Sequence, residues 1–216
     1  MTPTRELRWM AQGHEYFMSC LRSIDDRRLA GPSALPGWTG SHILSHIGHN
    51  ARALGRLAHW AVTGEPTPMY PNPSTRAQEI GIGAGWPVPK LREFVAEEQN
   101  RLATALDEVT GDQWRTEVVT AQGRTVPAST IPWLRSRELW IHACDLPSGG
   151  DFTAMPEDFV DALVHDVLTH RRTRQSIAVR VSGPAVDVAR WLTGRGTSPR
   201  LHSANGAELP ELPPWL

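Results

Sequence analysis

The sequence lacks the features that mark several large classes of protein. Only two of its 216 residues are cysteine, too few for a disulfide framework or a cysteine-rich metal site. No apolar run approaches the ~20 residues that span a membrane, and the N-terminal MTPTRELRWM has no apolar signal core. The 22 basic and 23 acidic residues are well mixed, which indicates no surface for nucleic acid or anionic membranes. We therefore expect a cytoplasmic protein, with a monomer favoured, that binds neither nucleic acid nor membranes.

The two cysteines, Cys20 and Cys144, lie far apart, and each is followed by helix-compatible sequence. Free cysteine is among the most buried residue types, so both are interpreted as small buried side chains. If the protein carries out thiol chemistry, we expect the thiol to come from a cofactor.

The first two-thirds of the chain is expected to be helical, because apolar residues recur at steps of three and four. Hydrophobic residues make up 40% and charged residues 21% of the chain, as in ordinary soluble domains. Proline and glycine clusters separate the periodic segments. Together these signals predict helices over residues 7–24, 39–64, 87–109, 130–144 and 156–170.

The other segments differ in pattern. Residues 64–87 are rich in proline and glycine, which predicts a long connection that is functional or disordered. A short hairpin or extended loop is expected around Gln122 and Gly123. Residues 176–182 alternate like a strand, and a short helix and turns follow. The sequence thus predicts an α+β protein, with a helical metal-binding bundle over residues 1–172 and a small α/β domain over residues 173–216.

Glu138 and His142 are four residues apart in RSRELWIHACDL, so on a helix they lie on one face, about one turn apart. An imidazole and a carboxylate suit Zn²⁺ or another borderline divalent ion. A third ligand is available from SHILSHIGHN, which offers His42, His46 and His49. Helical bundles commonly build metal sites from facing helices.

Simpler interpretations apply to the same residues. An isolated Glu/His pair at helical spacing is also typical of a surface pair or a capping contact. His42 follows the expected helix cap Thr39 by three residues, and its ring can serve the helix N-terminus. Spacing alone leaves the choice among the three histidines open.

Several segments resemble the family of mycothiol-dependent maleylpyruvate isomerases, within the wider DinB-like metalloprotein group. They are GWTGSHILSHIGHNARAL, HWAVTGEPTPMY, STRAQEI, VVTAQGRTVPAS, RSRELWIHACDL, the GRG turn and the terminal LPPWL. The resemblance covers most of the chain and is most specific over residues 120–146. It implies an N-terminal four-helix bundle and a small C-terminal α/β domain.

The resemblance also implies roles for particular residues. The metal ligands would be His46, Glu138 and His142, with zinc expected first and nickel, cobalt or manganese as alternatives. A catalytic arginine in the GRG turn would be Arg195. Arg76 and Arg124 are weaker candidates for holding the thiol cofactor or the substrate, with a solvated surface position as the alternative for each. Arg137, beside a ligand, is interpreted as structural.

The activity that the resemblance implies is the conversion of maleylpyruvate to fumarylpyruvate in gentisate breakdown. Mycothiol would add to the activated alkene, allow the new single bond to rotate, and leave. The divalent metal would lower the pKa of the thiol or stabilise the enolate oxygen. Alternatives are a mycothiol S-transferase acting on other electrophiles, and a non-catalytic metal-binding bundle protein.

Overall fold

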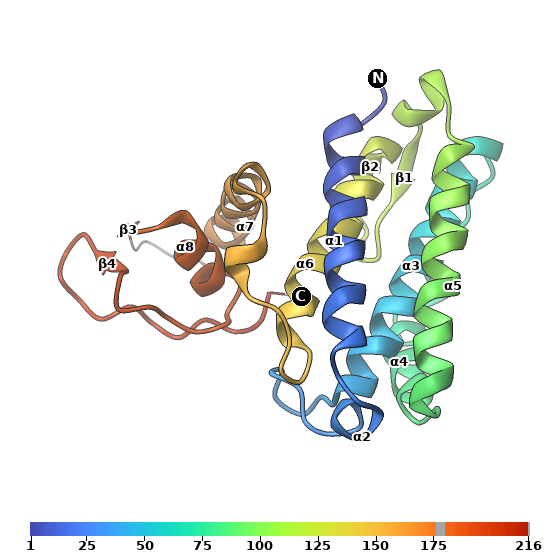
Figure 1. The fold of residues 1–216 in the computed structure, drawn as a ribbon. Coiled ribbons are helices and arrows are strands. Elements are labelled where there is room, and N and C mark those ends of the chain that lie inside the picture. Colours follow the sequence, from blue (N-terminus) through green and yellow to red (C-terminus); the bar gives the residue numbers. More distant parts are fainter. Residues whose placement is uncertain (176–179, 216) are drawn as a thin grey trace. The chain divides into compact units, whose positions relative to one another are not determined.

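Helices dominate the computed structural model, which describes residues 1–175 and 180–215 (Figure 1). Among the described residues, no helix combines the length and apolar character needed to cross a membrane. The helices are α1 (Thr4–Arg22), α2 (Asp26–Leu29), α3 (Gly40–Thr63), α4 (Thr75–Ala84), α5 (Val88–Asp107), α6 (Ile131–Asp145), α7 (Glu157–Gln175) and α8 (Ala185–Leu192), with 3₁₀ turns η1 (Gly111–Arg115), η2 (Ala128–Thr130) and η3 (Phe152–Ala154).

The chain divides into two compact units, Met1–Gly150 and Asp151–Leu216. The boundary predicted near residue 172 falls inside α7. The structure groups α7 with the second unit because this helix packs against α8. Both divisions give the predicted α+β arrangement, a helical bundle followed by a small unit with short strands.

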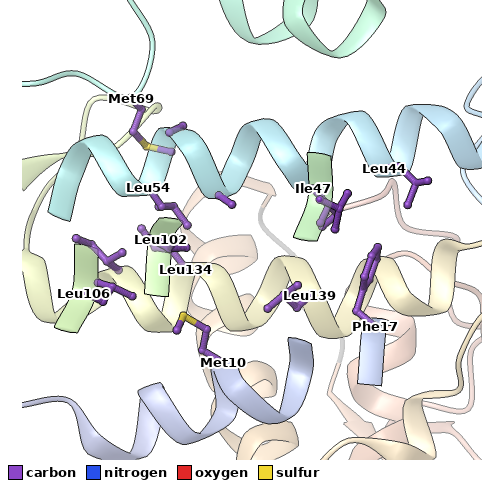
Figure 2. Packing of buried hydrophobic residues seen from close by; sticks show 14 of the residues in the cluster. Met10, Phe17, Leu44, Ile47, Leu54, Met69, Leu102, Leu106, Leu134 and Leu139 are labelled. Atoms are coloured by element: carbon purple, nitrogen blue, oxygen red, sulfur yellow. The ribbon is translucent and has the colours of Figure 1, made fainter. Parts of the chain in front are cut away.

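Four long helices form the first unit. Helix α3 packs against α5 and α6, and α1 packs against α6. Figure 2 shows apolar side chains converging between these helices, among them Met10 of α1, Ile47 of α3, Leu102 of α5 and Leu139 of α6. Every apolar residue of the predicted α3 stripe is buried: Ile43, Leu44, Ile47, Ala51, Leu54, Leu57, Ala58 and Ala61. The helical periodicity of the sequence therefore identified the core-facing side of α3 correctly.

Helix α3 starts in close contact with the segment before it. The N–H of Gly40 donates to the carbonyl of Gly31 at 3.0 Å. A Cβ at Gly40 would lie only 2.6 Å from the carbonyl oxygen of Leu29 and 3.0 Å from its Cα. These are backbone atoms of α2, so they cannot move away without shifting that helix.

Gly40→Ala is therefore expected to lower the free energy of unfolding by about 2 kcal/mol, as overpacking typically does. The control is Gly55→Ala in the same helix, where a Cβ would meet no atom within 4 Å. That change is expected to raise stability by about 0.5–1 kcal/mol, because glycine is a poor helix residue. Urea unfolding followed by circular dichroism measures both. A Gly40 variant as stable as the Gly55 variant would contradict the close backbone contact.

The proline-rich stretch over residues 64–87 is not a bare connection, because it contains helix α4. Ser45 of α3 holds this helix: its Oγ lies 3.0 Å from the carbonyl oxygen of Ile80 and 3.3 Å from that of Glu79. Gly83 permits the approach, since a Cβ there would collide with Ser45 Oγ. The loop before α4 is anchored by Met69, whose carbonyl accepts from Arg56 Nη1 at 2.6 Å.

The strands are short and antiparallel. Strands β1 (Glu117–Val119) and β2 (Thr125–Pro127) pair with Val118 opposite Val126, and Gly123 in their turn has φ of 75°. This is the hairpin predicted around Gln122 and Gly123. Strands β3 (Val181–Ser182) and β4 (His202–Ser203) pair in the second unit. Most of the strand predicted over residues 176–182 lies outside the described residues.

Arg171 of α7 organises the second unit. Its side chain is 2% exposed, and it donates from Nε to the carbonyl of Leu192 and from Nη2 to that of Pro213, both at 2.7 Å. The indole of Trp191 donates to the carbonyl of Pro210 at 2.9 Å. The described part of the proline-rich tail forms neither helix nor strand and is held by these side chains.

Candidate metal centre

The three histidines of the segment SHILSHIGHN, all on α3, have different surroundings. His42 completes a capping box, in which Thr39 Oγ1 accepts from the His42 N–H and His42 Nδ1 accepts from the Thr39 N–H. His49 Nδ1 lies 2.8 Å from the carbonyl oxygen of Ser45, one turn earlier on its own helix. His46 contacts Glu138 and His142 of α6. The capping role suggested for His42 from the sequence is the one that the structure contains.

His46, Glu138 and His142 converge in the interior of the first unit. His46 Nε2 lies 2.8 Å from Glu138 Oε2, and His142 Nε2 lies 3.3 Å from the same oxygen. One ligand atom from each residue can be chosen so that all three lie within 4.8 Å of one another. Both histidines are 1% exposed and Glu138 is 9% exposed. The residues predicted as metal ligands are therefore brought together, and the cluster could hold a metal ion.

Asp145 orients one of these histidines. Its Oδ2 lies 2.8 Å from Nδ1 of His142, one turn earlier on α6, and its side chain is fully buried. A carboxylate accepts hydrogen bonds, so neutral His142 carries its proton on Nδ1 and keeps a lone pair on Nε2. Carboxylates hold metal-binding histidines in this way in many proteins.

The protonation states suit a cation. Burial raises the pKa of Glu138, but His46 and His142 outweigh burial and hold that pKa well below its usual range. Burial lowers the pKa of His46 to about 4, although the Glu138 carboxylate opposes this. Burial also lowers the pKa of His142, but Asp145 and Glu138 together raise it above the usual value. At neutral pH the cluster thus contains an ionised carboxylate and a neutral His46 imidazole.

Two buried ring nitrogens of this cluster have no hydrogen-bond partner among the described residues, His46 Nδ1 and His142 Nε2. Buried polar atoms are nearly always partnered, so such atoms call for an explanation. His142 Nε2 carries a lone pair and faces the Glu138 carboxylate. A nitrogen lone pair beside a carboxylate oxygen is the kind of ligand pair that binds a divalent ion. The residues present therefore fit a metal ion.

Three further side chains surround the cluster. The ring of Trp38 meets that of His46 edge to face, with centroids 5.8 Å apart. The positive charge of Arg76, on α4, contributes to the lowered pKa of His46. Burial raises the pKa of Tyr70 to about 12, with Arg76 opposing and Glu138 reinforcing the rise. Arg76 and Tyr70 are thus close enough to the cluster to interact with it electrostatically.

The other arginines singled out from the sequence occupy different places. Arg124 is exposed in the β1–β2 turn. Arg137 is 9% exposed and its guanidinium lies 5.9 Å from the centre of the Trp133 ring. Arg195 lies in the second unit between Gly194 and Gly196, which have φ of 76° and 92°. Its Nη1 donates to the Thr193 carbonyl at 2.5 Å.

Sequence reasoning missed Asp145, Tyr70 and Trp38. Asp145 had a usable signal, since it follows His142 by three residues in HACD and so lies on the same helical face. Trp38 and Tyr70 lie outside the regular helices, where periodicity gives no information about contacts.

Comparisons with known proteins found one matching family and two similar solved structures. Residues 10–147 match the family described as the mycothiol maleylpyruvate isomerase N-terminal domain. The crystal structure of a mycothiol-dependent maleylpyruvate isomerase matches with a TM-score of 0.92 at 35% sequence identity, covering 100% of this chain and 98% of that one. A histidine-to-alanine mutant of such an isomerase matches with a TM-score of 0.91 at the same identity and coverage. A search of curated proteins found no match.

Proposed function

Because this chain belongs to the mycothiol maleylpyruvate isomerase N-terminal domain family, we propose that it is an enzyme that converts maleylpyruvate to fumarylpyruvate with mycothiol and a divalent metal. In this proposal the chain serves gentisate catabolism. One observation carries it: the buried cluster of His46, Glu138 and His142, in a chain that resembles a solved isomerase along its whole length.

The metal would be held by His46, Glu138 and His142. Zinc is proposed first, because a His₂Glu donor set is common in catalytic zinc sites, which leave a position open for another ligand. A bound ion supplies a positive charge that lowers the pKa of a coordinated thiol. Glu138 balances part of that charge, and Asp145 keeps the His142 lone pair directed at the ion. The burial of all three ligands excludes water and strengthens electrostatic interactions at the site.

Mycothiol would supply the nucleophile, whose sulfur can add to the activated alkene and leave again after bond rotation. The chain's own thiols are unsuited to this step. Cys20 and Cys144 are both half-buried, and burial raises the pKa of Cys20, whereas a reactive thiol needs a lowered pKa. Neither cysteine belongs to the metal cluster.

The substrate carries two carboxylates, which planar guanidinium groups bind well. Arg195 is proposed as the catalytic arginine that anchors and orients one carboxylate. Arg76 is proposed to bind the thiol cofactor or the second carboxylate, supported by its electrostatic effect on His46. Arg124 is retained as a weaker candidate for the same purpose, at the exposed end of the β1–β2 hairpin.

The direct test is absorbance-monitored turnover of maleylpyruvate by purified protein, with and without mycothiol, before and after treatment with a chelator. We expect fumarylpyruvate only when both thiol and metal are present, with activity restored by adding Zn²⁺ back. Mycothiol consumption with other electrophiles but no isomerisation would assign the chain as an S-transferase. Metal binding without any thiol-dependent activity would leave a non-catalytic bundle protein and refute the proposal.

Asp145→Asn is expected to weaken metal binding about tenfold, as loss of a charged partner of a metal-binding histidine commonly does. The amide keeps the size of the side chain but no longer stabilises the Nδ1–H form of His142 with a full negative charge. Competition with a chromophoric chelator measures the affinity. Asp187→Asn, a buried carboxylate of the second unit, is the control and should leave the affinity unchanged. Equal affinities for both variants would contradict the orienting role of Asp145.

A further inference from the structure

A guanidinium group lies inside the core, one turn from the proposed metal ligand Glu138. Arg135 of α6 has no exposed surface. Its Nη1 donates to the carbonyl of Ile47 and to Asn50 Oδ1, both at 2.9 Å, and its Nε donates to Gln99 Oε1 at 2.9 Å. One planar group therefore connects α6 to α3 and α5.

The fold alone does not account for an arginine at this place. Burying a cation carries a large desolvation cost, and an apolar side chain of similar volume is often as stabilising or more so. Nη2 of Arg135 is buried without a hydrogen-bond partner among the described residues. Burial lowers the pKa of Arg135 to about 10, with Glu138 opposing the change, so the group stays charged at neutral pH. A costly charge that is incompletely partnered points to a role at the neighbouring site.

Two of the hydrogen-bond partners of Arg135 lie on α3, close in sequence to His46. Ile47 directly follows His46 on α3, and Asn50 lies one turn further along that helix. Arg135 itself precedes Glu138 by three residues on α6, which places the two side chains on neighbouring turns. The two hydrogen bonds to Ile47 and Asn50 thus connect the turn that presents His46 to the turn that presents Glu138.

We infer that Arg135 is a positioning residue of the metal centre, which fixes the spacing between His46 and Glu138. This inference rests on the metal site of the proposed function. Arg135 does not touch the ion. It acts through its hydrogen bond to the backbone of α3, and Gln99 and Asn50 hold its plane in place.

The inference separates metal affinity from the stability of the fold. Arg135→Met fills the same space without a charge or donors and leaves three buried acceptors unpaired, so the metal-free protein is expected to be less stable than the wild type. The spacing of the two ligand-bearing turns is no longer fixed, so metal binding is expected to weaken at least about tenfold. Arg135→Lys keeps the charge but lacks the planar fork, so it should restore only part of the affinity.

The experiment measures two quantities on the full-length chain: the Zn²⁺ dissociation constant by chelator competition, and urea unfolding of the metal-free protein. Arg92→Met is the matched control. Arg92 is an arginine of α5 that donates to the carbonyls of Leu21 and Ile24 and to Asp26. The Arg92→Met variant should be less stable than the wild type, while its Zn²⁺ affinity remains that of the wild type.

Zn²⁺ affinities of Arg135→Met and Arg135→Lys within about twofold of the wild type would overturn the inference, since positioning residues of metal sites have larger effects. If Arg135→Met does not fold, the folded lysine variant decides: an unchanged affinity overturns the inference and a weakened one supports it. A wild-type protein that binds no Zn²⁺, nor any other divalent ion, would refute the proposed metal centre itself. That result appears with the wild-type protein, before any variant is compared. Failure of the metal centre is therefore distinguishable from failure of the positioning role of Arg135.

Discussion

His46→Ala is expected to lower kcat/KM for mycothiol-dependent isomerisation about 1000-fold, because a metal ion contributes several kcal/mol to catalysis and each 1.36 kcal/mol is tenfold in rate. Alanine removes the only candidate ligand on α3 and leaves Glu138 and His142, which share one helix. Two ligands on a single helix hold an ion less firmly than three from two helices. We expect purified variant protein to contain little metal.

The control is His42→Ala, four residues earlier on the same helix. His42 forms the capping box with Thr39, so its loss should cost about 1 kcal/mol of stability, as for other N-terminal caps. Turnover and metal content should stay near those of the wild type. The readouts are absorbance at saturating mycothiol and elemental analysis of the protein. A His46→Ala variant that keeps its metal would show that His46 is not a ligand, even if turnover is lost.

Arg195→Met is expected to lower kcat/KM about 100-fold, because a hydrogen bond between a guanidinium and a carboxylate contributes up to about 3 kcal/mol. Metal content and the unfolding midpoint should not change, since the side chain of Arg195 is only half-buried and the glycines beside it keep the turn. Arg195→Lys should recover part of the activity, because lysine retains the charge but not the planar fork.

Arg200→Met tests whether the effect belongs to Arg195 or to the whole loop. Arg200 pairs with the buried carboxylate of Asp187 at 2.8 Å, and its own side chain is exposed. Its loss should leave turnover within about twofold of the wild type, because exposed ion pairs contribute little. If the Arg200 and Arg195 variants lost activity equally, the loop would matter only as a structural element and the catalytic role of Arg195 would be refuted.

The helices of the first unit were largely predictable from the sequence. Apolar residues recur every three or four positions, and the residues that form the α3 stripe are all buried. Helix α4 was not predicted, because five prolines over residues 66–73 and 87 obscured the pattern. This helix depends on contacts distant in sequence, such as Ser45 Oγ on the Ile80 carbonyl. Residues 64–87 alone carry no sign of that contact.

The candidate site was predictable in part. The spacing of Glu138 and His142 indicated a shared helical face, but spacing could not choose among the three histidines of SHILSHIGHN. Family resemblance pointed to His46, which is the histidine that meets α6 in the structure. Arg135 could not be recognised, since arginine is almost never fully buried and only the packing of three helices makes its environment visible. The boundary between the units was also hidden, because α7 continues the helical pattern of the bundle.

The pairing of His46 with Glu138 joins two helices whose contacting residues are 92 positions apart in sequence. An ion shared by them would bind the folded chain, in which the two ligands meet, and would stabilise it by mass action. Metal binding would thus be coupled to folding of the bundle. Since the ion would contact side chains of both helices, it would oppose their separation, and local opening of this helix pair should become rarer when metal is bound.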